Sequence, residues 1–304
     1  MIVSDPAEFT RLTRAGQFPP RGAASARGAF LVTPLGMTLA QESAQDNRYM
    51  AMAESFDASL ALEQHATLAR ALSQRVPVTA FPGDAATPDA VFPNNVFGTA
   101  PGRVIYGRMR HAVRRREAER ADIRRWFGEV LEREAFDLAQ ADFIAELTGS
   151  LIIDRARGIG FCGLSERCDA AGARAMHEAF GLRLTFCFDL APSEYHTNVV
   201  MSVLASRALV IARDGFADPA AAEAIARFYS PRVVDLSPAQ KADYAGNCIA
   251  LDDGAVWFSA RAARSLTAAQ KSDLAAWGFA VESVELSEIE KAGGSLRCCV
   301  GEIY

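Results

Sequence analysis

Residues 149–190 read GSLIIDRARGIGFCGLSERCDAAGARAMHEAFGLRLTFCFDL, and this stretch predicts one complete structural unit. Two short apolar runs flank a polar turn at residues 155–158, which is the pattern of a β-hairpin. A helix is expected next, because Asp169 can cap its start and Gly181 can end it. The apolar run at residues 183–190 then predicts a third strand.

The same order of hairpin, helix and strand recurs along the chain about every 50 to 60 residues. Strands are expected within residues 29–36, 76–81, 89–109, 196–212, 232–236, 248–263, 280–286 and 297–304, and helices within residues 50–75, 115–133, 218–230 and 267–278. No linker rich in Ser, Pro and Gly interrupts these units. We therefore expect an α/β fold in one closed array, with a polar N-terminal extension at residues 1–27 and a single domain at residues 28–304.

Composition and charge limit the classes of function. The 304 residues carry a net charge of −5, which gives no general attraction to nucleic acid or to an anionic membrane. No run of 18 apolar residues could span a bilayer, and the N-terminus lacks the apolar stretch of a signal peptide. We expect a cytoplasmic protein with a small-molecule partner, and the sequence leaves open a homodimer.

The six cysteines form no Cys-x-x-Cys pair, and the spacings of a zinc site are absent. A disulfide framework is typical of short secreted chains, and this chain is long. We expect most of these residues to be reduced, buried thiols, and we expect no metal or organic cofactor.

The basic run at residues 108–125 has almost no aromatic interleaving, which argues against a nucleic-acid helix. A solvated helix face with Arg–Glu pairs is the favoured interpretation. Alternatively, an arginine near Met109 reaches a substrate carboxylate.

Among the four histidines, His196 is the candidate for chemistry. His65 and His177 lie in expected helices, and His111 lies in the basic run, where we expect it to be solvated. His196 stands at the entry of a buried strand, where a loop brings functional residues to the end of an element. A thiolate and an imidazole together form a nucleophile and its proton carrier, and a carboxylate such as Glu146 can orient the imidazole.

The stretch FPNNVFGT, residues 92–99, places the amides of Asn94 and Asn95 between large apolar side chains. Such amides are common in turns, or they form the polar floor of an apolar pocket. An amide both donates and accepts hydrogen bonds, so this floor would suit a neutral or delocalised ligand.

Five motifs taken together resemble the guanidine-modifying, or pentein, superfamily of arginine deiminases, dimethylargininases, amidinotransferases and dihydrolases. They are FPNNVFGT with RRREAER, TGSLIIDR with LSERCD, YHTNVVMSV, AGN at residues 245–247, and GGSLRC at residues 293–298. The chain looks most like the citrulline hydrolase and arginine dihydrolase-like members, which are often labelled amidinotransferase-type. The resemblance implies a five-bladed α/β propeller of ββαβ modules around a polar channel.

The resemblance also implies the catalytic residues. The family's nucleophile follows a glycine-rich loop and falls on Cys298, its histidine falls on His196, and its acidic residue falls on Glu146. Cys298 would attack the carbon of a guanidino or ureido group, and His196 would protonate the leaving amine and then activate water. We expect Cys298 to begin the last strand, so that alternation turns Cys299 into the packing.

The substrate follows from the same resemblance. Deiminases of the superfamily carry Arg-Asp where this chain has Asn94 and Asn95, and relatives with Asn act as dihydrolases or citrulline hydrolases. The implied reaction converts citrulline or arginine to ornithine, ammonia and CO2. The residues expected to bind the substrate are Asn95, Asn94, Phe92, Asn47 and Arg297.

Two departures from the family pattern concern the site. Leu147 stands where relatives carry glycine after the acidic residue, and Ala40 and Gln41 stand where relatives carry asparagine before a Glu-Thr-Ala segment. The second departure leaves open an arginine derivative or another guanidino compound as the substrate.

Other functions remain as alternatives. One is a deiminase or dimethylargininase-like activity, and another is an amidinotransferase that passes the amidino group to an amine. A binding protein on the same scaffold, like the ribosome anti-association factor, is disfavoured because Cys298 and His196 are both present. A cysteine protease is disfavoured because no oxyanion-type motif adjoins Cys298.

Overall fold

The strands of the described chain form five separate small sheets. The computed structural model describes residues 1–14, 17–52 and 55–304. In the order of their hydrogen-bonded strands, the sheets are β1 (Ile2–Val3), β9 (Leu184–Asp189), β8 (Ile159–Leu164) and β7 (Leu151–Asp154); β10 (Met201–Leu204), β11 (Ala208–Ile211) and β12 (Val233–Asp235); β13 (Ala255–Ser259) and β14 (Ala280–Val284); β15 (Gly301–Ile303), β2 (Gly28–Val32) and β3 (Val78–Phe81); and β4 (Phe97–Ala100), β5 (Arg103–Tyr106) and β6 (Glu134–Asp137).

Four of these sheets share one pattern of pairing. An antiparallel pair is extended by a parallel strand in β7–β8–β9, β10–β11–β12, β4–β5–β6 and β15–β2–β3. The parallel strand is always reached through helical segments, as a parallel connection requires. The predicted order of hairpin, helix and strand is therefore confirmed in three of these sheets, whereas in β15–β2–β3 the antiparallel pair joins strands from opposite ends of the described chain.

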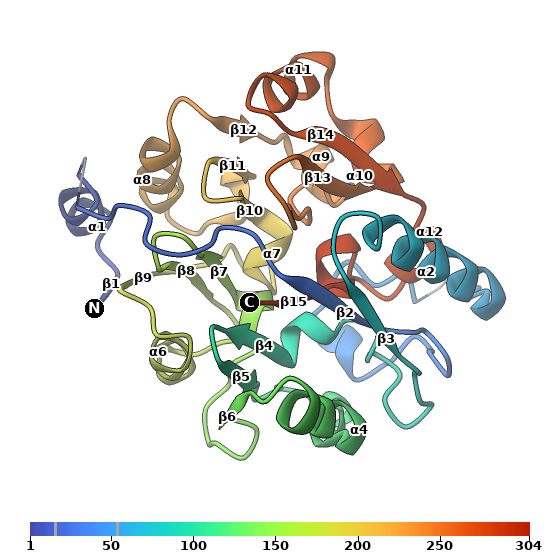
Figure 1. Cartoon of the computed structure of the whole chain (residues 1–304). Helices are drawn as coiled ribbons and strands as arrows, with labels where there is room; N and C mark the ends of the chain where they lie inside the picture. The colour runs from blue at the N-terminus through green and yellow to red at the C-terminus, as the bar shows by residue number, and fades with distance from the viewer. Residues whose placement is uncertain (15–16, 53–54) are drawn as a thin grey trace.

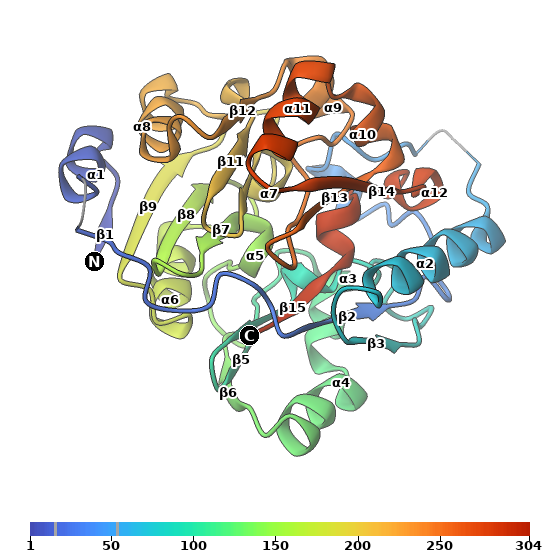
Figure 2. The same cartoon turned by 45° about the horizontal axis from the view of Figure 1, so that its top comes forward.

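The longer helices lie outside the sheets, and the one-turn segment before β10 lies near the centre (Figure 1). The helical segments include α1 (Pro6–Leu12), α2 (Ala58–Leu72), α3 (Ala112–Arg115), η3 (Arg116–Glu119), α4 (Ala121–Arg125), η4 (Trp126–Val130), α6 (Ala170–Ala179), α8 (Pro219–Tyr229), α9 (Pro238–Ala242), α10 (Ala260–Ser265), α11 (Ala268–Ala276) and α12 (Ser287–Glu290). The short segments are η1 (Ser43–Gln45), η2 (Pro93–Asn95), α5 (Leu147–Ser150), α7 (Thr197–Val200), η5 (Arg213–Gly215) and η6 (Leu296–Cys299). The tilted view of Figure 2 shows the same separation of outer helices from the centre.

Capping residues explain where α6 begins and where it ends. The Asp169 side chain accepts a hydrogen bond from the Gly172 N–H and so begins α6, as predicted. Gly181, at φ +63°, follows the end of α6 in the left-handed conformation that glycine adopts most readily. No helix of the described residues is long and apolar enough to cross a bilayer.

The N-terminal residues contribute to the first sheet and its core. β1 pairs with β9 in parallel, and Phe9 of α1 is fully buried with its ring stacked 4.6 Å from that of Phe186. The segment expected to be a polar extension thus includes a strand and a core residue. Positions 15 and 16 of that segment lie outside the described residues.

The helices differ from expectation in two places. The helix expected at residues 50–75 is α2, which spans Ala58–Leu72, and positions 53 and 54 lie outside the described residues. The helix expected at residues 115–133 is not continuous, because Arg120 has ψ 105° and breaks the chain of helical turns between η3 and α4.

The strands also differ in two places. The first arm of the hairpin expected at residues 248–263 forms only an isolated bridge between Ile249 and Trp257. The last strand begins at Gly301, so the expectation that Cys298 starts this strand is wrong. Cys298 lies in η6, where Ser295 O accepts hydrogen bonds from the N–H groups of Cys298 and Cys299 at 3.0 and 3.3 Å.

Candidate active site

Polar side chains are placed at the centre by one-turn segments that lie directly before inner strands. η2 precedes β4, α5 precedes β7, α7 precedes β10, and η6 precedes β15. Glu146 and His196 are the N-cap residues of α5 and α7, and Asn95 and Cys298 lie in η2 and η6. α5 contacts both η2 and α7, and η2 contacts η6, so residues distant in sequence meet here.

Glu146 and His196 form a fully buried pair. His196 Nε2 lies 2.8 Å from Glu146 Oε2, and neither side chain is exposed. The Arg110 backbone N–H donates to Glu146 Oε1 at 3.1 Å, and Arg167 Nη1 donates to the carboxylate at 3.2 Å. Burial raises the pKa of Glu146, but the Arg167 charge and the His196 hydrogen bond together hold this pKa below its ordinary value. Glu146 is therefore ionised at neutral pH.

The electrostatics of the pair define the state of His196. Burial lowers the pKa of His196, although the hydrogen bond to Glu146 opposes the shift. Because a carboxylate only accepts hydrogen bonds, a neutral His196 carries its proton on Nε2. Its Nδ1 is buried and has no hydrogen-bond partner in the described part of the chain. This nitrogen is then a free proton acceptor.

The Cys298 thiol is buried among amides. Asn247 Nδ2 lies 3.3 Å and Asn198 Nδ2 lies 3.6 Å from Cys298 Sγ. Burial raises the pKa of Cys298, while the hydrogen bond from Asn247 acts in the opposite direction. Cys299 is fully buried in an apolar cluster that also contains Cys298, and it follows Cys298 in the 3-10 turn η6, not in a strand.

Gly149 makes room where Asn95 and His196 converge. A Cβ at Gly149 would lie 2.8 Å from Asn95 Oδ1 and 2.8 Å from His196 Cε1. Asn95 Oδ1 is buried and lacks a partner among the described residues, and the same holds for both amide atoms of Asn94. These unpartnered polar atoms can receive the polar groups of a ligand.

A narrow pocket joins Cys298 to Asn95. Its lining residues are Ser43, Asn47, Asp89, Phe92, Asn95, Arg114, Arg167, Tyr195, Ala292, Gly293, Gly294 and Cys298. Asn47 Nδ2 donates to Gly293 O at 3.2 Å, and Gly294 packs so closely on the Phe92 ring that a Cβ there would lie 2.8 Å from it. The pocket therefore has a backbone and aromatic wall beside Cys298.

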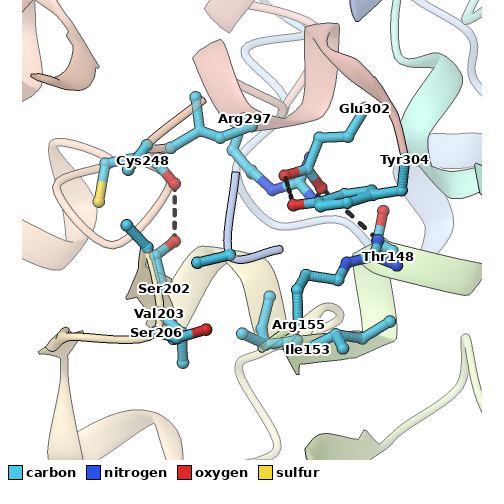
Figure 3. Close-up of a pocket in the computed structure, with 15 residues that line it drawn as sticks. Thr148, Ile153, Arg155, Ser202, Val203, Ser206, Cys248, Arg297, Glu302 and Tyr304 are labelled. Atoms are coloured by element: carbon cyan, nitrogen blue, oxygen red, sulfur yellow. Dashed lines mark hydrogen bonds and ion pairs between the residues drawn. The ribbon is translucent and has the colours of Figure 1, made fainter. Parts of the chain in front are cut away.

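Arg297 lies outside this pocket, although the sequence predicted a substrate contact. Its guanidinium donates to Val300 O at 3.1 Å and to Glu302 at 2.8 Å. Figure 3 shows Arg297 and Glu302 in another cavity, together with Tyr304 and Arg155. Arg297 and Cys298 are consecutive residues of η6, but Arg297 lines this cavity and Cys298 lines the narrow pocket. The prediction for Arg297 is not supported.

The basic segment also departs from expectation. Arg114 and Glu117 are both buried, and Arg114 Nε donates to Glu117 Oε1 at 2.8 Å. His111 is buried as well, with Nε2 3.1 Å from Asp46 Oδ1. The face that contains Arg114 turns inward and lines the pocket beside Cys298, so it is not a solvated face.

Several residues of the site were not singled out from the sequence. Asp89, Arg167 and Tyr195 line the pocket, and Asn198 and Asn247 contact the thiol. The signal was available for the two asparagines, because they lie in the motifs YHTNVVMSV and AGN. Within the described residues, no group of three or more His, Cys, Asp and Glu side chains could hold a metal ion.

Comparison with solved structures gives matches over most of the chain. The N-terminal domain of ArgZ, an arginine dihydrolase from the ornithine–ammonia cycle in cyanobacteria, matches with a TM-score of 0.79 and 19% identity, covering 90% of this chain and 97% of that chain. A dimethylarginine dimethylaminohydrolase in adduct with S-methyl-L-thiocitrulline matches with a TM-score of 0.71 and 23% identity, covering 91% of this chain and 100% of that chain. At these identities the matches establish a shared mixed α/β fold.

No curated protein matches the chain significantly. A comparison with whole protein families is more specific. The family described as N,N-dimethylarginine dimethylhydrolase, eukaryotic, matches residues 33–304. This range contains Glu146, His196 and Cys298. The chain therefore belongs to the dimethylarginine dimethylhydrolase family, a family of pentein-superfamily hydrolases that act on guanidino groups.

Proposed function

We propose that the protein is a cysteine-dependent hydrolase of guanidino or ureido C–N bonds in arginine-type amino acids, and that it converts citrulline or arginine to ornithine, ammonia and CO2. The observation that carries this proposal is the position of Asn95, which meets His196 at Gly149 and also lines, together with Cys298, one narrow pocket. A nucleophile, a proton carrier and a neutral polar floor are what such a hydrolysis needs.

In the first half of the proposed reaction, the Cys298 thiolate forms a bond to the central carbon of the substrate. His196, protonated at Nδ1 and held through Nε2 by Glu146, gives that proton to the departing amine. The C–N bond breaks, ammonia leaves, and His196 becomes neutral. The Glu146 carboxylate favours the imidazolium that this step requires, because the two groups are 2.8 Å apart in a buried site.

In the second half, the free Nδ1 of neutral His196 takes a proton from water as the water attacks the same carbon. Collapse of this adduct breaks the S–C bond and returns the Cys298 thiolate. Arginine would yield citrulline at this point. In a second round ammonia leaves the ureido group, and water releases the Nδ-carbamate of ornithine, which decomposes to ornithine and CO2.

The floor of the pocket supports a neutral ureido ligand. Asn95 keeps an unpartnered acceptor, Oδ1, without the charge of an aspartate. Charged groups are still present farther along the lining, with Asp89 against Arg114 and Arg167. These opposite charges suit the zwitterionic end of an amino acid. Asn47 and Phe92 would shape the wall, and Asn94 would support η2.

A second candidate is dimethylargininase activity, which the family match favours. An amidinotransferase would differ only in the acceptor, since an amine would replace water in the second half. In either case Cys298, His196 and Glu146 would keep their proposed roles.

The arrangement of the five sheets around one centre supports a five-bladed α/β propeller, with residues 28–304 as a single catalytic domain (Figure 1). The buried free cysteines support a reducing, cytoplasmic location. A guanidino or ureido small molecule is the proposed partner, and a homodimer is compatible with this proposal.

The test is a product analysis by mass, with citrulline, arginine and N,N-dimethylarginine supplied separately and a Cys298→Ala variant as the control. We expect ornithine from citrulline, and none from the control. Dimethylamine from dimethylarginine without any turnover of citrulline would replace the dihydrolase proposal with the second candidate. A product joined to added glycine would indicate transfer.

An Asn95→Asp variant tests the role of the neutral floor. We expect it to lose citrulline turnover relative to arginine turnover by at least about tenfold, because a carboxylate binds a guanidinium and not a ureido group. Asn94→Asp is the matched control. An unchanged citrulline-to-arginine ratio in Asn95→Asp would contradict the assignment.

A further inference from the structure

Asn198 and Asn247 approach the Cys298 sulfur from two separate segments of the chain. Asn198 lies in α7, and Asn247 follows α9 and precedes the bridge residue Ile249. Both side chains are fully buried. Neither residue belongs to the Glu146–His196 pair.

The hydrogen bonds around Asn247 define which end of its amide faces the sulfur. Its Oδ1 accepts the Cys298 backbone N–H at 3.4 Å, and its Nδ2 donates to Asn198 O at 2.9 Å. A flipped amide would set NH2 against the N–H of Cys298 and oxygen against the carbonyl of Asn198, which would lose both bonds. The NH2 group is therefore the end 3.3 Å from Sγ.

Asn198 has a similarly defined orientation. Its Nδ2 donates to Thr148 O at 3.3 Å, and its Oδ1 accepts from Asn247 Nδ2 at 3.3 Å. Its amide edge faces Cys298 Sγ, with Nδ2 at 3.6 Å and Oδ1 at 3.7 Å. It can accept a hydrogen bond from a thiol and donate one to a thiolate.

We propose that the amides of Asn247 and Asn198 form a donor pair that stabilises the Cys298 thiolate, with Asn247 as the principal donor. The proposal deepens the proposed function, since it rests on Cys298 as the nucleophile. As sulfur bonds to the substrate carbon, its negative charge is lost and the two donors weaken. They strengthen again when the S–C bond breaks, which favours release of the product.

Two other groups near Cys298 also favour the thiolate, but neither is a side-chain donor to Sγ. Among the described residues, the side chains that hydrogen-bond Sγ are those of Asn198 and Asn247, and the Ser295 backbone also lowers the pKa of Cys298. Arg297 acts on the thiolate through its charge but is bonded to Glu302. The remaining ionisable neighbours are Tyr195, Tyr244 and Cys299 around the thiol, and Asp89, Arg114 and Arg167 along the pocket. In a buried site, two direct donors count for more than in water.

The test measures the rate of Cys298 alkylation by iodoacetamide against pH, with no substrate present and the alkylated cysteine identified by peptide mass. Asn247→Asp keeps the acceptor for the Cys298 N–H and removes the donor to Sγ. We expect the alkylation pKa to rise by at least about one unit, so that alkylation below that pKa slows about tenfold and recovers at higher pH. Asn198→Asp should shift the pKa less.

Asn94→Asp is the matched control, because it adds a carboxylate to η2 at a buried amide that does not contact Sγ. An equal shift in this variant would show that charge alone is responsible and would overturn the proposal. So would an unchanged alkylation pKa in Asn247→Asp. A purely structural effect would lower the rate at all pH values without moving the profile.

A measurement on the unaltered protein avoids any folding defect of the variants. We expect the side-chain amide NMR signals of Asn247 to shift as Cys298 titrates, and signals that stay constant would overturn the proposal. Both measurements are independent of turnover. The proposed hydrolysis can therefore fail while Asn247 still lowers the pKa of Cys298. Equally, the hydrolysis can be found while Asn247 has no effect on this pKa, and the two results are distinguishable.

Discussion

Leu147 directly follows Glu146 and shows how a single residue is accommodated beside the catalytic candidates. Its φ of 26° lies at the edge of the left-handed region that favours glycine. Its buried side chain lies against Gly98 and Gly107, where a Cβ at Gly107 would come 2.8 Å from Leu147 Cγ. These glycines leave the space that the leucine fills.

Gly149 gives the prediction at this scale. A Gly149→Ala variant places a methyl group within 3 Å of Asn95 and His196, so one of the two must move. We expect a loss of turnover of about 100-fold, because small displacements of reacting groups are costly in rate. The measurement is kcat with the substrate found by product analysis, and intact folding is checked by thermal unfolding.

Gly128→Ala is the control, since a Cβ at Gly128 meets no atom within 4 Å. It should leave kcat unchanged. Full activity in Gly149→Ala would show that the space above Gly149 is not used in the reaction.

At the scale of elements, the features with local signals were predictable. The hairpin β7–β8 has its polar turn, and α6 has its Asp169 cap and Gly181 end. The one-turn segments had no such signal, because four residues carry no periodicity and their form depends on contacts with other segments. Hence His196 was expected to enter a strand directly but caps α7. The motifs predicted Glu146, His196 and Cys298 as candidate residues. Asn198 and Asn247 were not singled out, although they lie in two of the motifs, because their contacts with Cys298 depend on the fold.

The prediction at the scale of elements concerns the helical segments from α3 to η4. Glu117→Gln would remove the carboxylate that is ion-paired with the buried Arg114 guanidinium, and we expect a loss of about 3 kcal/mol in the free energy of unfolding. Denaturant unfolding measures this loss. Glu119→Gln, at an exposed position of the same segment, should change stability by less than about 0.5 kcal/mol. Equal effects of the two substitutions would contradict the importance of the buried pair.

At the scale of the whole molecule, the buried His65 makes the free energy of unfolding depend on pH. His65 of α2 is 2% exposed, and burial lowers its pKa to about 4. An ordinary value near 6.5 in the unfolded chain means that the unfolded state binds the proton first as pH falls. The contribution of neutral His65 to the free energy of unfolding is therefore fully present above pH 6.5 and is lost as the pH falls toward 4.

A His65→Gln variant should have a flatter dependence of stability on pH. Between pH 6 and pH 4.5 we expect the slope to fall by up to about 1.4 kcal/mol per pH unit. Unfolding by urea at several pH values measures this slope. The same slope in both proteins would mean that His65 is protonated in the folded state or accessible to water.

The closing of the last strand on β2 has a consequence for folding. Glu146, His196 and Asn247 all precede Cys298 in the chain, and η6 is held between them and the pairing of β15 with β2. A folding intermediate that has formed the other sheets but has not docked residues 296–303 would contain most of the pocket without a positioned nucleophile. Such an intermediate would be catalytically silent. Recovery of activity during refolding should therefore report the docking of residues 296–303, a long-range step, while collapse without this docking would be visible only by spectroscopy.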